Sequence, residues 1–353
     1  MSISNRKADH IQLCIDGDVG FTHKTTLLDD VEFIHDALPE LHVHDIDLST
    51  EFAGKKLRAP LVIAAMTGGV DKAETINTEL AQIAEELGIG FAFGSQRPLL
   101  QHNITAGYDV RNQAPTTLLL GNIGIVQATQ SSTGAIQQMV ERSAVDALCV
   151  HLNPAMEVVQ PEGDKDFRGG MECLERLQKE LSIPLVVKET GCGISRTVAE
   201  RIRNLGIAWV DVSGAGGTSW VAVETHRAQD SQKSLGQRFW DWGIPTAASV
   251  VQVSDAGLRS CATGGIQNGL MAAKAIALGA SCAGMARVVL QAHNAGGYNG
   301  AKVFLQQCID EIRIAMLLTG SQNISQLQTK PLIISNTLQK WIGKNSSIEK
   351  RIW

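Results

Sequence analysis

Eight short apolar runs, each leading into a Gly-rich or polar end, constrain most strongly how this chain can fold. An unbroken apolar run, rather than an alternating one, indicates a strand covered on both faces, as in parallel strands joined by helices. Eight such units joined by right-handed crossovers predict an α/β fold, a TIM (β/α)8 barrel; an open doubly wound sheet is the alternative. The runs are Leu61–Met66, Ile89–Gly94, Thr117–Gly121, Asp146–His151, Leu185–Glu189, Trp209–Ser213, Arg259–Thr263 and Ser281–Met285.

Helix-like stretches lie between several of these runs. Residues Lys72–Leu87 place apolar side chains on one helical face and are followed by glycine, a common helix stop. Ser195–Leu205 ends in the same way, and Pro245 favours a helix start at Thr246–Ala256. The alternation of apolar runs with helices supports the barrel.

One domain can account for all 353 residues, because barrels with insertions reach this length. Two segments do not fit the repeat: an N-terminal extension, residues 1–59, and an insertion after the sixth strand, residues 214–243. Loops of this length in a compact domain are usually lids or interfaces, so we expect the first to cover substrate and the second to act as a lid. Residues 321–353 are expected to form a polar, mostly helical tail.

The charge balance argues against a nucleic-acid partner. With 31 Lys and Arg against 36 Asp and Glu, an anionic ligand requires a local cluster of cations. No apolar stretch reaches the ~20 residues needed to span a bilayer, and the first residues lack the apolar core of a signal peptide. We therefore expect a cytoplasmic protein with no membrane partner. The seven cysteines form no C-x-x-C pair and are expected to be buried thiols.

Residues just after the strands are the first candidates for chemistry, since barrel active sites lie at the carboxyl ends of the strands. Gly264 and Gly265 leave backbone N–H groups free to bind a phosphate, helped by the helix that follows; a simple chain turn is the alternative. Lys188 lies in an apolar run, where an unpaired ammonium is costly. It either pairs with Glu189 or another strand-end acid, or it contacts a ligand such as a flavin, whose pyrimidine edge becomes negative on reduction.

A polar pair ends the fourth strand. His151 and Asn153 point to the same side because side chains alternate along a strand, so we expect both to face a ligand; a structural, buried histidine is the alternative. Glu157 follows on the rim and is a hard oxygen ligand of the kind that Mg²⁺ prefers.

Basic residues gather at the start of the chain. Arg6, Lys7 and His10 would neutralise a diphosphate if this segment folds over the barrel mouth beside Arg97. Otherwise they form a solvated group without a ligand.

The chain resembles the type 2 isopentenyl-diphosphate delta-isomerases over nearly its whole length. The motifs RKADH, AAMTGG, FGSQR, GNIG, HLNPAMEVVQPEGD, VVKETGCGISR, VDVSGAGGTSW, TGGIQNG and GMAR carry the resemblance in family order. It implies a TIM barrel that binds FMN, requires Mg²⁺, is reduced by NADPH and interconverts isopentenyl and dimethylallyl diphosphate in isoprenoid biosynthesis. It also implies a cytoplasmic homo-oligomer, a tetramer or an octamer.

The resemblance also implies a role for individual residues. Catalytic roles fall on His151, Asn153 and Lys188, and the metal on Glu157. Substrate would be bound by Arg6, Lys7, His10, Ser95, Gln96, Arg97 and Met156. FMN would contact Ala65, Met66, Thr67, Gly68, Ser95, Asn122, Lys188, Ser213, Thr218, Gly264, Gly265, Met285 and Ala286.

One position departs from the family pattern. Met156 stands where most members carry a Gln thought to touch substrate and to help move the proton, and a thioether is a weak acceptor with no donor. Either that amide is dispensable, or Gln160 replaces it, or the activity has diverged to that of another flavoprotein. Another FMN barrel oxidoreductase remains the alternative, and so does a dehydrogenase using Cys261 as nucleophile, although Cys261 lies within an apolar strand.

Overall fold

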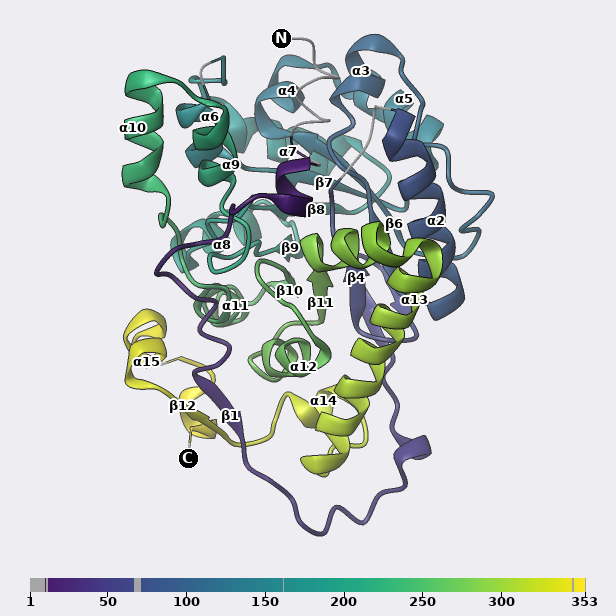
Figure 1. The fold of residues 1–353 in the computed structure, drawn as a ribbon, viewed down its shortest axis with the longest axis vertical. Coiled ribbons are helices and arrows are strands. Elements are labelled where there is room, and N and C mark those ends of the chain that lie inside the picture. Colours follow the sequence, from purple (N-terminus) through teal and green to yellow (C-terminus); the bar gives the residue numbers. More distant parts are fainter. Residues whose placement is uncertain (1–9, 11, 67–70, 161, 345, 353) are drawn as a thin grey trace.

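Eight parallel strands close into a barrel in the computed structural model, which describes residues 10, 12–66, 71–160, 162–344 and 346–352 (Figure 1). Every barrel strand falls on one of the predicted runs, and one of them continues three residues beyond its run, to Gly124. The predicted TIM barrel is therefore confirmed, and the open sheet is wrong. The barrel strands are β4 (Leu61–Ile63), β5 (Gly90–Ala92), β6 (Leu119–Gly124), β7 (Ala147–His151), β8 (Leu185–Lys188), β9 (Trp209–Asp211), β10 (Arg259–Ala262) and β11 (Cys282–Met285).

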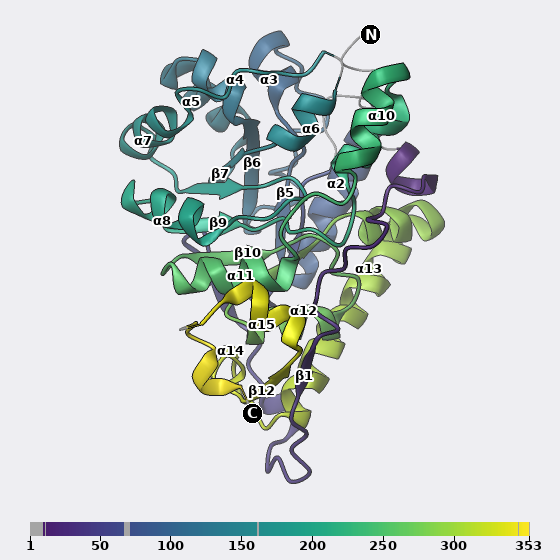
Figure 2. The same cartoon turned by 90° about the vertical axis from the view of Figure 1, so that its left-hand side faces the viewer.

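Helices surround the barrel, as Figures 1 and 2 show. The three predicted helices appear as α2 (Asp71–Leu87), α8 (Arg196–Asn204) and α11 (Thr246–Asp255), within about two residues of their expected ends. The Ser195 hydroxyl caps α8 by accepting a hydrogen bond from the Val198 N–H. Apart from the helices of the insertion and of the tail, the other helices between or after barrel strands are α3 (Arg97–His102), α4 (Ile125–Gln130), α5 (Thr133–Ser143), α6 (Pro154–Val159), α7 (Gly170–Glu180), α12 (Gly269–Ala277) and α13 (Arg287–Leu318).

A hairpin closes the amino-terminal end of the barrel. Its strands are β2 (Thr50–Phe52) and β3 (Lys55–Leu57). Phe52 is fully buried and packs edge-on against Trp209 at the start of β9, with ring centroids 5.3 Å apart. Because this end is filled with apolar side chains, a ligand cavity has room at the opposite end, where the strands terminate.

The two ends of the chain meet outside the barrel. Strand β1 (Val31–Phe33) pairs antiparallel with β12 (Leu332–Ile334), and Figure 1 shows them side by side. The tail is thus only partly helical: it contains α14 (Ile324–Leu327), α15 (Asn336–Ile342), the 3-10 turn η2 (Glu349–Arg351) and a strand that the sequence did not predict. The N-terminal segment also contains a 3-10 turn, η1 (Val43–Asp45).

The insertion after the sixth barrel strand is itself helical. It contains α9 (Trp220–Arg227) and α10 (Asp230–Phe239). An isolated bridge between Gly20 and Thr218 is one of its contacts with the N-terminal segment. No helix in the described part of the chain is long and apolar enough to cross a membrane.

Candidate active site

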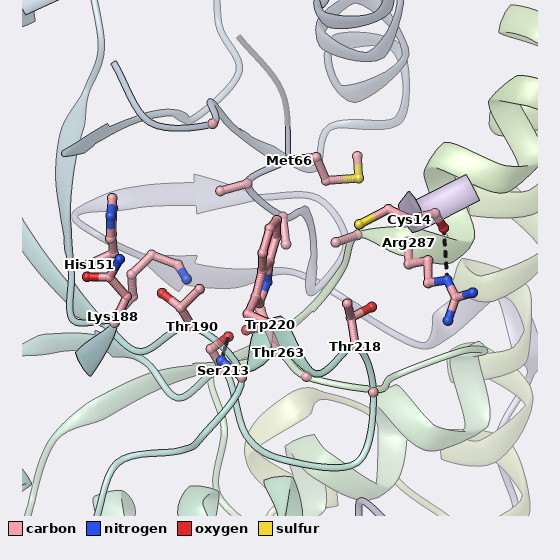
Figure 3. A pocket seen from close by; sticks show the side chains of 18 of the residues that line it. Cys14, Met66, His151, Lys188, Thr190, Ser213, Thr218, Trp220, Thr263 and Arg287 are labelled. Atoms are coloured by element: carbon pink, nitrogen blue, oxygen red, sulfur yellow. Dashed lines mark hydrogen bonds between the residues drawn. The ribbon is translucent and has the colours of Figure 1, made fainter. Parts of the chain in front are cut away.

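A cavity of about 440 Å³ lies at the carboxyl ends of the barrel strands (Figure 3). This volume is typical of a site for a small molecule or a cofactor. Sixteen of the predicted site residues line it: His10, Ala65, Met66, Ser95, Arg97, Asn122, His151, Asn153, Met156, Glu157, Lys188, Ser213, Thr218, Gly264, Gly265 and Ala286. Arg6, Lys7, Thr67 and Gly68 fall outside the described residues.

Two predicted residues do not line this cavity. Gln96 is fully buried, and its side-chain oxygen accepts a hydrogen bond of 2.9 Å from the Asn122 N–H. Met285 is buried in the core. Gln96 therefore holds the ends of β5 and β6 together from behind the cavity wall, and Met285 precedes the cavity-lining Ala286.

The protonation of His151 is fixed by its neighbour. The Asn122 amide donates to the Phe93 carbonyl at 3.0 Å, so its oxygen faces His151 Nδ1 at 2.9 Å. His151 Nδ1 must then carry the hydrogen, which leaves Nε2 as an acceptor. Its enclosed position, and secondarily the Lys188 ammonium, lowers the pKa of His151 to about 3. The imidazole is neutral at physiological pH and cannot serve as a fixed cation.

Lys188 forms a buried ion pair with a strand-end acid, one of the alternatives left open by the sequence. Its Nζ lies 3.6 Å from Asp211 Oδ2 and donates to the Glu189 carbonyl at 2.5 Å. Asp211 also accepts hydrogen bonds from the Thr263 hydroxyl and, at 3.1 Å, from the Ser213 N–H. Since Lys188 also lines the cavity, the pairing leaves it available to a ligand.

Glu189 is a buried acid that the sequence did not assign to the site. Its carboxylate accepts hydrogen bonds from the N–H groups of Thr190, at 2.5 Å, and Cys192. Burial is the largest influence and raises the pKa of Glu189 to about 7, against the opposing effect of these bonds. Glu189 thus holds in place the loop that brings Thr190 and Gly191 to the cavity.

Two glycine-rich loops interlock on one side of the cavity. Gly264 has a φ of 99°, and a Cβ there would lie 2.1 Å from the Gly214 carbonyl oxygen. A Cβ on Gly217 would lie 2.3 Å from the Gly265 nitrogen, so neither position accepts a larger residue. Helix α13 starts beside these loops at Arg287, and the first N–H groups of a helix favour an anion. Backbone donors on this side suit a phosphate.

The wall built by α6 carries a connected set of oxygens and amides. Asn153 Nδ2 donates to Glu157 Oε1 at 2.7 Å, and the Asp164 N–H donates to Glu157 Oε2 at 2.8 Å. Gln127, another cavity residue that the sequence did not single out, donates to Asp164 Oδ2 at 2.7 Å. Glu157 is thereby oriented, while no group of three or more metal-binding side chains occurs in the described ranges. A metal here would have to complete its shell with water or ligand oxygens, as Mg²⁺ commonly does.

The N-terminal segment lies across the mouth of the cavity. Arg287 donates to the carbonyls of Cys14, at 2.9 Å, and Gly17, at 2.7 Å. Two backbone hydrogen bonds join the segment to the insertion. The Phe21 N–H donates to the Gly217 carbonyl at 3.2 Å, and the Ser219 N–H donates to the Val19 carbonyl at 2.8 Å. Figure 3 shows Cys14 and Arg287 together at one side of the pocket.

His10 is held by a residue that the sequence did not predict. Its Nε2 lies 2.8 Å from Oε1 of Glu224, a fully buried acid of α9. The Glu224 carboxylate also accepts a hydrogen bond of 2.7 Å from the Arg227 guanidinium. The His10 and Trp220 rings pack edge-on at 5.3 Å. Trp220 is the last residue of the SGAGGTSW motif and Arg287 the last residue of GMAR, so their place in these motifs could have identified both as site residues. Glu224 lies in no such motif, and the sequence offered no sign of its role.

Two cavity residues carry buried polar atoms without a hydrogen-bond partner among the residues that the structure describes. They are Gln160 Oε1 and Thr190 Oγ1. Unpaired buried polar atoms are rare in folded proteins and frequently mark a ligand, an ion or a water. Cys261, by contrast, lies below this cavity, and both its hydrogen bond with Cys282 and its burial raise the pKa of its thiol, which makes it a poor nucleophile.

Comparisons with known proteins agree with this geometry. The FMN-dependent dehydrogenase family matches residues 108–334. The isopentenyl-diphosphate delta-isomerase of Methanothermobacter thermautotrophicus is 42% identical over 352 residues, 99% of this chain and 98% of that protein. The one of Thermococcus kodakarensis is 42% identical over 348 residues, 96% and 93% of the two chains.

Solved structures show the same fold at much lower identity. A flavocytochrome b2 mutant matches with a TM-score of 0.69 and 19% identity, over 97% of this chain and 86% of that one. A mandelate oxidase mutant with an FMN adduct matches with a TM-score of 0.65 and 17% identity, over 94% and 100%. These similarities show the architecture alone.

Proposed function

We propose that this chain, which belongs to the type 2 isopentenyl-diphosphate delta-isomerase family, interconverts isopentenyl and dimethylallyl diphosphate on reduced FMN. The observation that carries the proposal is the cavity in which Lys188, the neutral His151 and the two interlocked glycine loops meet at the barrel mouth. The 42% identity to isomerases over nearly the full length supports it.

The cavity residues fit an FMN molecule. The Gly264–Gly265 turn, Thr218 and the start of α13 would hold its phosphate, and Asn122 and Lys188 would face its ring. A bound ligand would also satisfy the two polar atoms of the wall that lack a partner among the described residues. When bound and reduced, FMN supplies an electron-rich surface against an alkene cation and a site for proton transfer at N5.

The protein's own residues fix the diphosphate. Arg97 lines the cavity and is joined there by His10, His151 and Asn153; Arg6 and Lys7 are proposed to complete the set. Because His151 is neutral and its Nε2 carries no hydrogen, it acts as a positioning group or an acceptor rather than as a charge. Holding the diphosphate fixed keeps the alkene in a single orientation for protonation and deprotonation, and the covered mouth limits water.

Glu157 is the proposed Mg²⁺ ligand. Its carboxylate is oriented by Asn153 and by the Asp164 N–H, and it lines the same cavity as Arg97. Mg²⁺ held by this one carboxylate would complete its shell with water and would offset the charge of the diphosphate. We further propose NADPH as the reductant of the flavin.

Met156 lines the cavity, as the position of the missing Gln requires. Gln160, which follows directly after α6 on the same wall, is buried, and its amide oxygen has no hydrogen-bond partner among the described residues. This supports the replacement of the absent amide by Gln160 over a divergence of the activity.

A cytoplasmic homo-oligomer, a tetramer or octamer, is the proposed state of the protein. Phe239 and Trp242 pack with ring centroids 5.8 Å apart on the insertion, yet 42% and 60% of their surfaces are exposed. Exposed aromatic residues of this kind are enriched at protein interfaces. Light scattering of the purified protein tests the assembly.

Two measurements test the function. The purified protein should show flavin absorption, and it should convert isopentenyl to dimethylallyl diphosphate with FMN, Mg²⁺ and NADPH present. A flavoprotein that instead oxidises a 2-hydroxy acid, with no isomerase turnover, would overturn the isomerase proposal and favour the oxidoreductase. A protein without flavin would overturn both.

A further inference from the structure

Thr190 carries a buried hydroxyl for which the described protein provides no acceptor. It lies two residues beyond Lys188 and lines the cavity, but its Oγ1 makes no hydrogen bond within the described structure. An unsatisfied buried hydroxyl destabilises the folded state. At the wall of a cavity, such a group points to an acceptor on a bound molecule.

The neighbouring polar groups are already committed to one another. The Lys188 ammonium is a donor and so cannot accept, and Asp211 is occupied by Lys188, the Thr263 hydroxyl and the Ser213 N–H. Ser213 Oγ accepts a hydrogen bond of 3.1 Å from the Gly191 N–H. Within the described residues, the acceptor left for the Thr190 hydroxyl is therefore a molecule in the cavity.

The backbone holds Thr190 in a defined place. Its own N–H donates to the buried Glu189 carboxylate, and the next residue, Gly191, donates to the Ser213 carbonyl at 3.0 Å. Figure 3 shows the Thr190 side chain between those of Lys188 and Ser213 along the pocket floor. A donor held in this way loses little entropy when it binds, which favours a specific contact.

We propose that the Thr190 hydroxyl donates a hydrogen bond to the N1–C2=O edge of bound FMN, beside Lys188, and thereby favours the reduced flavin. This inference rests on the proposed FMN site. The edge gains negative charge on reduction, and a hydrogen bond to a charged acceptor contributes about twice as much as one to a neutral acceptor. Thr190 is accordingly a flavin-tuning residue and not a mere part of the wall.

The test compares Thr190→Val, which has nearly the same shape without the hydroxyl, with Thr190→Ser, which keeps it. FMN affinity is titrated for the oxidised and the reduced flavin, and the midpoint potential of the bound flavin is measured against reference dyes. We expect Thr190→Val to weaken reduced FMN about tenfold more than oxidised FMN, which lowers the potential by about 30 mV for two electrons. Thr190→Ser should stay near wild type.

Thr319→Val provides the matched control. Thr319 is buried at the end of α13, outside the cavity lining, and its hydroxyl already donates to the Ala315 carbonyl. Its loss should lower stability without moving the potential. Should Thr190→Val fail to fold, Thr190→Ala also lacks the hydroxyl and carries the same expectation.

The outcomes separate this inference from the proposed function. If wild type binds FMN and the potential of Thr190→Val is unchanged, the inference is wrong while the FMN site stands. An equal loss of affinity for both flavin states also overturns it, because the hydroxyl would then contact an uncharged part of the cofactor. If wild type binds no FMN, the proposed function itself fails.

Discussion

Replacing Lys188 by Met removes one partner of a buried ion pair and, on our proposal, a flavin contact. Nζ lies 3.6 Å from Asp211 Oδ2, and both side chains are about one-tenth exposed. Breaking such a pair costs about 3–5 kcal/mol, because the remaining charge stays buried without its counterion. Asp211 keeps its hydrogen bonds from Thr263 and Ser213, so we expect the lower end, about 3 kcal/mol.

The double variant Lys188→Met/Asp211→Asn separates stability from cofactor binding. Chemical denaturation of the apoprotein should show the loss in the single variant and most of it regained in the double variant, since no buried charge is then left unpaired. FMN titration should show both variants weakened by roughly tenfold or more, the effect of one lost hydrogen bond to a charged group.

Two results would refute this reasoning. A double variant that binds and reduces FMN like wild type would remove Lys188 from the flavin site. A single variant with unchanged unfolding free energy would mean that Asp211 is stable in this position without a counterion.

The remaining predictions concern the cover, a buried acid, the metal and the family's missing amide. Arg287→Met removes two hydrogen bonds to residues 12–17, the part of the N-terminal segment that covers the cavity. Hydrogen exchange of these residues should speed up by about tenfold or more, and the substrate KM should rise. Unchanged exchange would show that other bonds hold this segment in place. Glu189 keeps its proton in the folded state up to about pH 7 but releases it near pH 4.5 when unfolded, so its contribution to stability, full at acid pH, is lost as the pH rises through this window. In a plot of melting temperature against pH, Glu189→Gln should remove the decrease between about pH 4.5 and pH 7. An unaltered curve would count against the raised pKa of Glu189. Glu157→Gln should abolish most activity together with activation by Mg²⁺, whereas normal activation would place the ion elsewhere. The wild type should be an active isomerase, and Met156→Gln should be at most modestly faster, when turnover is measured with NADPH, FMN and Mg²⁺. A large increase in turnover would mean that Gln160 does not replace the Gln amide that most family members carry at position 156.

The barrel was predictable because its determinants are local. Each parallel strand is covered on both faces, so its sequence is apolar without interruption, and each run could be recognised by itself. The pairing of β1 with β12 joins segments about 300 residues apart through Val31 and Ile334, and no local pattern reports such a partner. The strand in the tail was missed for that reason.

Most residues that line the cavity were predictable, but the direction of individual side chains was not. Ser95, Gln96 and Arg97 form one motif, but Ser95 and Arg97 line the cavity whereas Gln96 is directed into the structure behind it. Glu224 was missed because its role depends on His10, 214 residues away in the sequence. The chemistry of a position follows from its residue type, whereas its partners follow from the fold.

The β1–β12 pairing makes the order of synthesis matter for the cavity mouth. The segment that covers the cavity leaves the ribosome first, but the strand that anchors its continuation at Val31–Phe33 is made among the last residues. During translation the barrel can close while its cover still lacks this anchor, so ligands can enter a nascent chain more freely than a finished one. Removing the residues after 330 deletes β12, so we expect it to loosen the N-terminal cover at the other end of the chain.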